Sequence, residues 1–123
     1  MILVDTSVWV DYLRGGDPPL VRLLEAEQVC THDFVVGELA CGNLRNRTEL
    51  LGLLQSLPRL ASATDEETLF LIERRKLMGR GIGYVDAHLL AATILGGARL
   101  WTKDKALKSI ADENKCGHTG EGH

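Results

Sequence analysis

The sequence lacks the excess of positive charge that marks many nucleic-acid-binding proteins. Its 14 Lys and Arg residues are outnumbered by 17 Asp and Glu residues, which gives a formal net charge of -3. A chain with this balance has no global basic field to attract a polyanion. Any site for a nucleic acid must therefore be a local patch.

Paired cysteines and long apolar runs are also missing. Cys30, Cys41 and Cys116 form no CxxC pair and leave an odd thiol, which argues against a disulfide framework or a zinc ribbon. No apolar run approaches membrane-spanning length, and the chain starts with the apolar segment MILV rather than a basic leader. We expect a soluble, unprocessed protein without membrane association, in a reducing, cytoplasmic setting.

The composition that is present fits one folded domain. The chain has 123 residues, and 45% of them are hydrophobic, which is enough for a single packed core. We expect one domain over residues 1–115 and a flexible C-terminal tail over residues 116–123, because the last residues, CGHTGEGH, are small and polar.

Strand-like and helix-like segments alternate along the chain. Short apolar runs at 1–4, 29–32, 60–63 and 99–102 predict strands, and the first is typical of a strand buried on both faces. Helical patterns follow from about residue 7 and over 18–27, 33–41, 48–57, 66–78, 84–95 and 104–114. This alternation predicts an α/β fold with a central parallel sheet covered by helices on both faces.

Four acidic residues fall where such a fold places its ligands, outside the carboxyl ends of the strands. Asp5 ends the first strand and Asp104 follows the last one. Asp86 lies in the first turn of the apolar helix over 84–95, and Glu38 lies on the helix after the second strand. Carboxylates that converge repel one another, so the arrangement makes sense mainly as a site for Mg²⁺ or Mn²⁺. Such a site supports nuclease or phosphatase chemistry.

Each acid also has a structural explanation. Asp86 suits a helix start because of the helix dipole, and Asp104 suits an N-cap. Glu38 lies off the centre of the apolar stripe of its helix, as a solvated side chain would. Asp5 is the hardest to explain structurally, because an acid that ends a buried strand needs a partner.

Four blocks of sequence carry a family likeness: VDTSVWVD, VVGELACGNLRNR, GYVDAHLLAA and LWTKDKAL. With these blocks in this order and spacing, the chain resembles the VapC-type PIN-domain ribonuclease toxins of type II toxin–antitoxin systems. The resemblance covers nearly the whole chain to about Leu107 and leaves the GHTGEGH tail outside it.

The resemblance implies a three-layer α/β/α sandwich in which four acids surround Mg²⁺ or Mn²⁺. These acids correspond here to Asp5, Glu38, Asp86 and Asp104. It also implies a hydroxyl residue beside the first acid, for which Ser7, Thr6 and Thr102 are candidates. Family members cleave RNA, are neutralised by a small antitoxin protein and commonly form homodimers, so the resemblance implies all three properties.

Local basic residues support an RNA substrate, because phosphate contacts need positive charge near the metal. The candidates are Arg45, Arg47, Arg80 and Lys103. His88 lies two residues after Asp86, which turns it about 200° away on a helix, so we interpret it as a packing or interface residue. We expect the helix over 84–95 to supply the main dimer contact. The helices near the N-terminus carry enough apolar residues either to pack in the core or to line an antitoxin groove, namely Val8, Trp9, Tyr12, Leu20, Leu23 and Leu24.

Other functions fit parts of the pattern. A phosphatase with Asp5 as nucleophile, like the haloacid-dehalogenase enzymes, needs a second acid two residues later, where Ser7 stands. A receiver-like domain that binds a regulatory ion without catalysis is another interpretation. A PIN-domain nuclease that processes RNA without an antitoxin keeps the same fold and chemistry.

Overall fold

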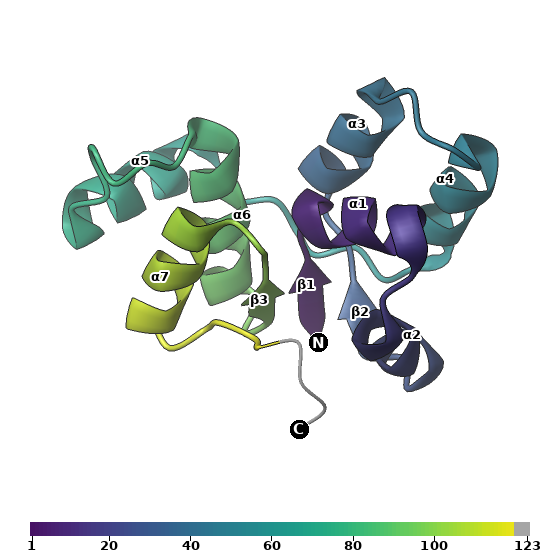
Figure 1. Cartoon of the computed structure of the whole chain (residues 1–123). Coiled ribbons are helices and arrows are strands. Elements are labelled where there is room, and N and C mark those ends of the chain that lie inside the picture. Colours follow the sequence, from purple (N-terminus) through teal and green to yellow (C-terminus); the bar gives the residue numbers. More distant parts are fainter. Residues whose placement is uncertain (120–123) are drawn as a thin grey trace.

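The computed structural model describes residues 1–119, which contain three strands and seven helices (Figure 1). The strands are β1 Ile2–Val4, β2 Val29–Cys30 and β3 Arg99–Trp101. The helices are α1 Thr6–Gly15, α2 Pro18–Glu25, α3 Asp33–Cys41, α4 Arg47–Ser56, α5 Asp65–Arg75, α6 Tyr84–Leu95 and α7 Lys105–Glu113.

The three strands form one parallel sheet in the order β2-β1-β3. β1 is the central strand and is buried along its whole length, as its unbroken apolar sequence predicts. Its last residue, Val4, pairs with Trp101, the last residue of β3. The residues that follow these two strands therefore leave the sheet side by side.

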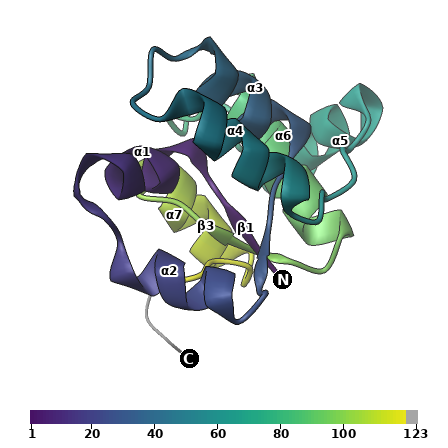
Figure 2. The ribbon, with the colours of Figure 1, turned by 90° about the vertical axis from the view of Figure 1, so that its right-hand side faces the viewer.

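Helices cover both faces of the sheet. Figure 2 shows α1, α2 and α7 on one side of β1, with α3, α4, α5 and α6 on the other. This confirms the expected α/β sandwich with a central parallel sheet. The elements lie in the expected order, and most of their ends fall within a few residues of the expected ones.

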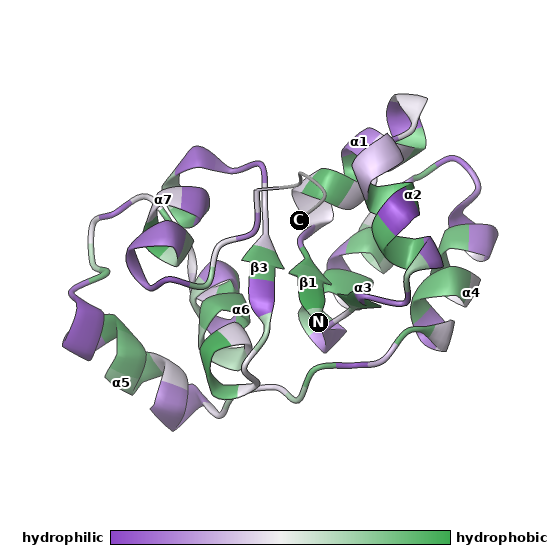
Figure 3. Cartoon of the chain, turned by 90° about the horizontal axis from the view of Figure 1, so that it is seen from below, coloured by the Kyte–Doolittle hydropathy of each residue, from purple (hydrophilic) through white to green (hydrophobic). Residues whose placement is uncertain are grey.

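The core is continuous across the sheet. Trp9 of α1, Leu39 of α3 and Leu90 of α6 are almost completely buried and belong to one hydrophobic cluster with β1. Most of α6 is hydrophobic (Figure 3), and its residues 87–93 are all buried. Within residues 1–119, no helix has the length and hydrophobicity needed to cross a membrane.

The strand expected over 60–63 does not form, so that prediction is wrong. A single bridge joins Thr31 to Arg59, flanked by hydrogen bonds from the Thr31 amide to Pro58 and from the Leu60 amide to Thr31. Pro58 has no amide hydrogen to extend the pairing on one side. The segment touches the end of β2 and then leaves the sheet.

The structure also differs from the expected tail boundary. Cys116 and His118 are buried, and a bridge between Gly117 and Leu100 places this segment beside β3. The amide of Leu100 donates to the Cys116 carbonyl, so backbone pairing with β3 fixes this segment. The small, polar composition of the segment did not predict that pairing. The rest of the expected tail, residues 120–123, lies outside the described residues.

Candidate metal-dependent active site

Asp5 is a buried carboxylate that two hydroxyl groups hold in place. Thr102 Oγ1 donates to Asp5 Oδ2 at 2.7 Å, and Ser7 Oγ donates to the same oxygen at 2.9 Å. The parallel pairing of β1 with β3 brings Thr102 beside Asp5 although 97 positions separate them. Ser7 lies in the first turn of α1. Within residues 1–119 no hydrogen bond reaches Asp5 Oδ1, so this oxygen is available to a ligand.

The same two hydroxyls also hold the loop that carries Asp104. Ser7 Oγ accepts the amide of Lys103 at 3.0 Å, and Thr102 Oγ1 accepts the amide of Asp104 at 3.1 Å. Asp104 is the N-cap of α7, where its Oδ1 accepts the Leu107 amide at 2.9 Å. This confirms the capping explanation for Asp104 and leaves its second oxygen at the surface.

Glu38 lies on α3 and Asp86 on α6, on the other face of the sheet, and the charge of Asp5 affects the pKa of both. Partial burial is the main cause that raises the pKa of Glu38, and the charges of Asp5 and Asp86 raise it further. Burial likewise raises the pKa of Asp86 most, and Asp5 and Asp104 add to the effect. These charge effects indicate that Glu38 and Asp86 lie near Asp5, and that Asp104 lies near Asp86. That the four acids form one metal site stays a prediction.

The donor set fits a hard divalent cation, because it consists of carboxylate oxygens whose mutual repulsion a cation would relieve. Thr6, the third hydroxyl candidate, contacts Glu38 only weakly, with 3.5 Å between Oγ1 and Oε1. Across residues 1–119 no three acidic, histidine or cysteine side chains stand close enough to enclose an ion as they are. The acids therefore share one electrostatic environment without forming a closed cage.

Three of the four expected RNA-binding side chains are engaged within the protein. Arg47 donates from Nε and Nη2 to the Ala40 carbonyl near the end of α3, and Arg80 forms a two-point ion pair with Glu113. Lys103 Nζ lies 2.8 Å from Asp11 Oδ2 and 2.9 Å from Asp17 Oδ2. Arg45 is exposed between α3 and α4 and makes no ion pair within the described part of the chain.

Sequence reasoning missed the pairing of Lys103 with Asp11 and Asp17. Asp11 lies one turn after Ser7 on α1, so both side chains face the loop of Lys103. This spacing could have predicted the ion pair of Asp11 with Lys103. Asp17 is buried and caps α2 by accepting the Leu20 amide. The pair ties the loop between α1 and α2 to the loop that carries Asp104.

His88 is a packing residue, as its position relative to Asp86 predicted. It is buried, its Nε2–H donates to Asp65 Oδ1 at 2.9 Å, and its Nδ1 lies 3.2 Å from Thr68 Oγ1. Asp65 also accepts a hydrogen bond from the hydroxyl of Tyr84 at 2.8 Å. The role of Asp65 had no signal in the sequence beyond its place at the start of a helix.

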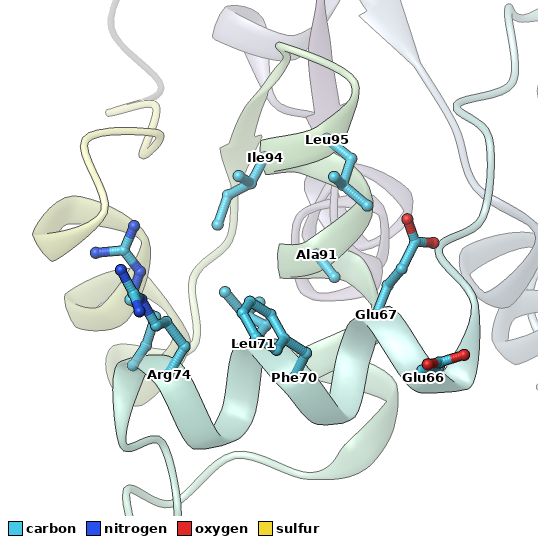
Figure 4. A pocket seen from close by; sticks show the side chains of 9 residues that line it. Glu66, Glu67, Phe70, Leu71, Arg74, Ala91, Ile94 and Leu95 are labelled. Atoms are coloured by element: carbon cyan, nitrogen blue, oxygen red, sulfur yellow. The ribbon is translucent and has the colours of Figure 1, made fainter.

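An apolar groove lies away from the four acids, between α5 and α6 (Figure 4). It has a volume of about 540 Å³ and an apolar floor of Phe70, Leu71, Ala91, Ile94 and Leu95. Glu66 and Glu67 stand at one end of this α5/α6 groove, with Arg74 and Arg75 at the other. Of the residues expected to line an antitoxin groove, Val8, Trp9 and Leu20 are instead buried in the core.

Known proteins match this chain over most of its length. The PIN domain family model matches residues 2–113. Ribonuclease VapC32 of Mycobacterium tuberculosis, curated for strains CDC 1551 / Oshkosh and H37Rv, is 49% identical over 115 residues, which cover 93% of this chain and 93% of that protein.

Solved structures share the fold at lower sequence identity. The crystal structure of FitAcB from Neisseria gonorrhoeae superposes with a TM-score of 0.63 at 22% identity and covers 91% of this chain and 94% of that one. PAE2754 from Pyrobaculum aerophilum superposes with a TM-score of 0.62 at 17% identity and covers 88% and 77%. The family match and the close relative together show that this chain belongs to the PIN-domain family, among its VapC-type members.

Proposed function

We propose that this protein is a divalent-metal-dependent endoribonuclease that acts as the toxin of a VapBC-type pair, with Mg²⁺ or Mn²⁺ as cofactor. The observation that carries the proposal is the placement of Asp5 at the end of β1, where Ser7 and Thr102 hold one of its carboxylate oxygens and also hold the loop that carries Asp104. The charge of Asp5 also raises the pKa of both Glu38 and Asp86, which supports a place for them in the same site. The close relative is named a ribonuclease, which supports RNA as the substrate.

In this proposal each acid contributes according to how it is held. Asp5 offers the rigid oxygen, because Ser7 and Thr102 fix its carboxylate through Oδ2 and leave Oδ1 open. Asp104 offers the oxygen that does not cap α7. Glu38 and Asp86 complete the set from the opposite face. A bound divalent ion supplies an activated water and neutralises charge on the leaving oxygen.

The test is cleavage of a defined RNA by the purified protein, with RNA ends mapped afterwards. We expect cleavage with Mg²⁺ or Mn²⁺ and none with EDTA. Asp5→Asn keeps the shape of the side chain but removes a formal charge, so we expect at least a hundredfold loss of activity, about the cost of losing one strong transition-state contact. An Asp5→Asn protein within a few-fold of wild type would exclude the four-acid site.

The proposed antitoxin partner follows from the same charges. An acid cluster without its metal offers an inserted Arg or Lys side chain a strong hydrogen-bonding target. Metal and antitoxin then compete for one site, so each must weaken the other's binding by the same factor. Release of a co-purified small protein as Mn²⁺ is added supports this partner, and an RNA-processing nuclease without an antitoxin would purify alone.

We also propose a homodimer built on the α5/α6 groove rather than on the middle of α6, which is buried within the protomer. Phe70 and Leu95 expose 66% and 61% of their surface beside this groove (Figure 4). The charges at the two ends of α5 have opposite signs, so two copies related by a twofold axis would place acid against base at both ends.

The three free cysteines are consistent with the cytoplasm as the compartment.

A further inference from the structure

The sheet fixes only two of the four acids directly. Asp5 and Asp104 follow β1 and β3, whose pairing sets their positions. Glu38 lies in the second turn of α3, and Asp86 follows a glycine-rich loop rather than a strand. Another feature must therefore set the spacing between the helices that carry Glu38 and Asp86.

A row of four aromatic rings, the His32–Phe34–His88–Tyr84 row, connects these two helices. The ring centroids of His32 and Phe34 are 5.2 Å apart, and those of Phe34 and His88 are 5.1 Å apart. The row ends with Tyr84, 4.6 Å from His88, and all three contacts are edge-to-face. Edge-to-face contacts at these distances are favourable and define the relative orientation of the rings.

The row contacts α3 and α6 within one helical turn of Glu38 and Asp86. Phe34 lies four residues before Glu38, one turn earlier on α3. Tyr84 and His88 lie two residues before and two residues after Asp86 on α6. The contact of Phe34 with His88 therefore joins the first turn of α3 to the first turns of α6.

His88 is the fixed member of the row. Its side chain is only 4% exposed, and α5 holds both ring nitrogens through Asp65 and Thr68. Asp65 also holds the hydroxyl of Tyr84, so α5 anchors the row on both sides of Asp86. Thr68 is itself held, because its hydroxyl donates to the Thr64 carbonyl at 2.9 Å.

We infer that His88 is a positioning residue that sets the separation of Glu38 and Asp86 and so prepares the proposed metal site. This inference rests on the proposed function. The two carboxylates repel each other, and a ring wedged between their helices keeps the helices in register against that repulsion. Supporting groups around a metal site commonly change metal affinity by about 10- to 100-fold when removed.

The test measures Mn²⁺ binding directly, by calorimetry or by the electron paramagnetic resonance signal of free Mn²⁺. His88→Ala removes the wedge, and we expect Mn²⁺ affinity to fall at least tenfold. His88→Phe keeps a ring between Phe34 and Tyr84, so we expect its affinity to stay within about threefold of wild type. Phe34→Ala breaks the row at a residue that is 37% exposed, and we expect the same direction of change as for His88→Ala.

Leu90→Ala is the matched control, because Leu90 is fully buried on the same helix but is not part of the His32–Phe34–His88–Tyr84 row. All variants are compared at a temperature where circular dichroism shows each to be folded. Wild-type affinity in both His88→Ala and Phe34→Ala would overturn the inference, as would an equal loss in Leu90→Ala. If the wild-type protein itself binds no Mn²⁺, the proposed function fails first and this inference falls with it.

Discussion

At the scale of single residues, Asp5 and Asp86 carry the same group in different surroundings. Two hydroxyls donate to Asp5, whereas the one hydrogen bond that Asp86 accepts within residues 1–119 is long, 3.4 Å from the Gly83 amide. Burial and neighbouring acids raise the pKa of Asp86 above its ordinary value of 3.8. A raised carboxyl pKa means that the charged form destabilises the folded protein at neutral pH.

Asp86→Asn should therefore stabilise the metal-free protein. The cost of the Asp86 charge is fully present above its folded pKa and disappears as pH falls below 3.8. At pH 7 we expect the free energy of unfolding to rise by about 0.5–2 kcal/mol, the range that such charge changes commonly give. Thermal denaturation in EDTA measures it.

With Mn²⁺ bound, we expect wild type to become more stable than Asp86→Asn. At a hundredfold excess over its Kd the ion should stabilise wild type by about 2.7 kcal/mol, while Asp86→Asn should gain little. A metal-free Asp86→Asn protein that is less stable than wild type at pH 7 would contradict the electrostatic account of this side chain.

Lys103 and Arg45 should respond oppositely to substitution, although both were expected to bind RNA. Lys103 holds Asp11 and Asp17, so Lys103→Met should lower the free energy of unfolding by roughly 1 kcal/mol, a figure reduced for its 38% exposure. Arg45 has an exposed side chain, so Arg45→Ala should leave stability unchanged but lower the salt dependence of RNA binding by about 0.7 per lost phosphate contact. Fluorescence anisotropy at several salt concentrations tests both, and a reduced slope in Lys103→Met would restore it as a phosphate contact.

At the scale of elements, α3 begins at a buried histidine. His32 Nδ1 accepts the Phe34 amide at 2.9 Å, which requires the neutral ring. Burial is the main cause that lowers the pKa of His32, the charges of His88 and Arg59 lower it further, and Asp33 opposes them. The start of α3 therefore depends on pH.

Stability should fall as pH drops below the ordinary histidine value of 6.5. In that range the unfolded chain binds a proton at His32 that the folded protein does not, and the loss grows until the folded pKa is reached. His32→Asn keeps a side chain that caps helices but does not titrate, so we expect a shallower dependence between pH 7 and 5.5. Urea denaturation at several pH values gives both curves, and identical slopes would assign the pH dependence to other groups.

Sequence patterns predicted the elements better than their connections. Strand-end positions and helix starts are visible in the order of residues, and they predicted the four acids as a group. That these acids form one metal site stays a prediction. The failed strand over 60–63 has an apolar sequence, but only backbone pairing distinguishes a strand from a segment with one bridge. The contacts of Asp65 with Tyr84 and His88 depend on how α5 packs on α6, which no local pattern encodes.

At the scale of the whole molecule, α5 exposes large apolar side chains that nothing within residues 1–119 of the protomer covers, among them Leu69 and Phe70. Figure 3 shows it hydrophilic at both ends and hydrophobic between them. Acid in its first turn and base in its last turn suit the helix dipole, and the same order is self-complementary about a twofold axis. In the proposed dimer, the exposed apolar residues between these ends would form the buried centre of the interface.

The proposed dimer can be tested by exchanging charges on α5. Glu66→Lys or Arg74→Glu alone places like charges together, and we expect each to weaken the dimer by about tenfold, which corresponds to 1.4 kcal/mol. The double variant restores opposite charges and should recover most of the affinity. Sedimentation velocity measures all three, and a monomeric wild type at micromolar concentration or additive losses in the double variant would reject this interface.

The parallel pairing of β1 with β3 also has a consequence for how the protein is made. A ribosome synthesises Asp5 97 positions before Thr102, which donates a hydrogen bond to it, and Asp104 follows Thr102. Until β3 has been made and has docked against β1, Asp5 lacks the second of its two hydroxyl partners and has no Asp104 beside it. Under the proposed function, the growing chain should not cut RNA until β3 has paired with β1, so each copy should become active only after its synthesis is nearly finished.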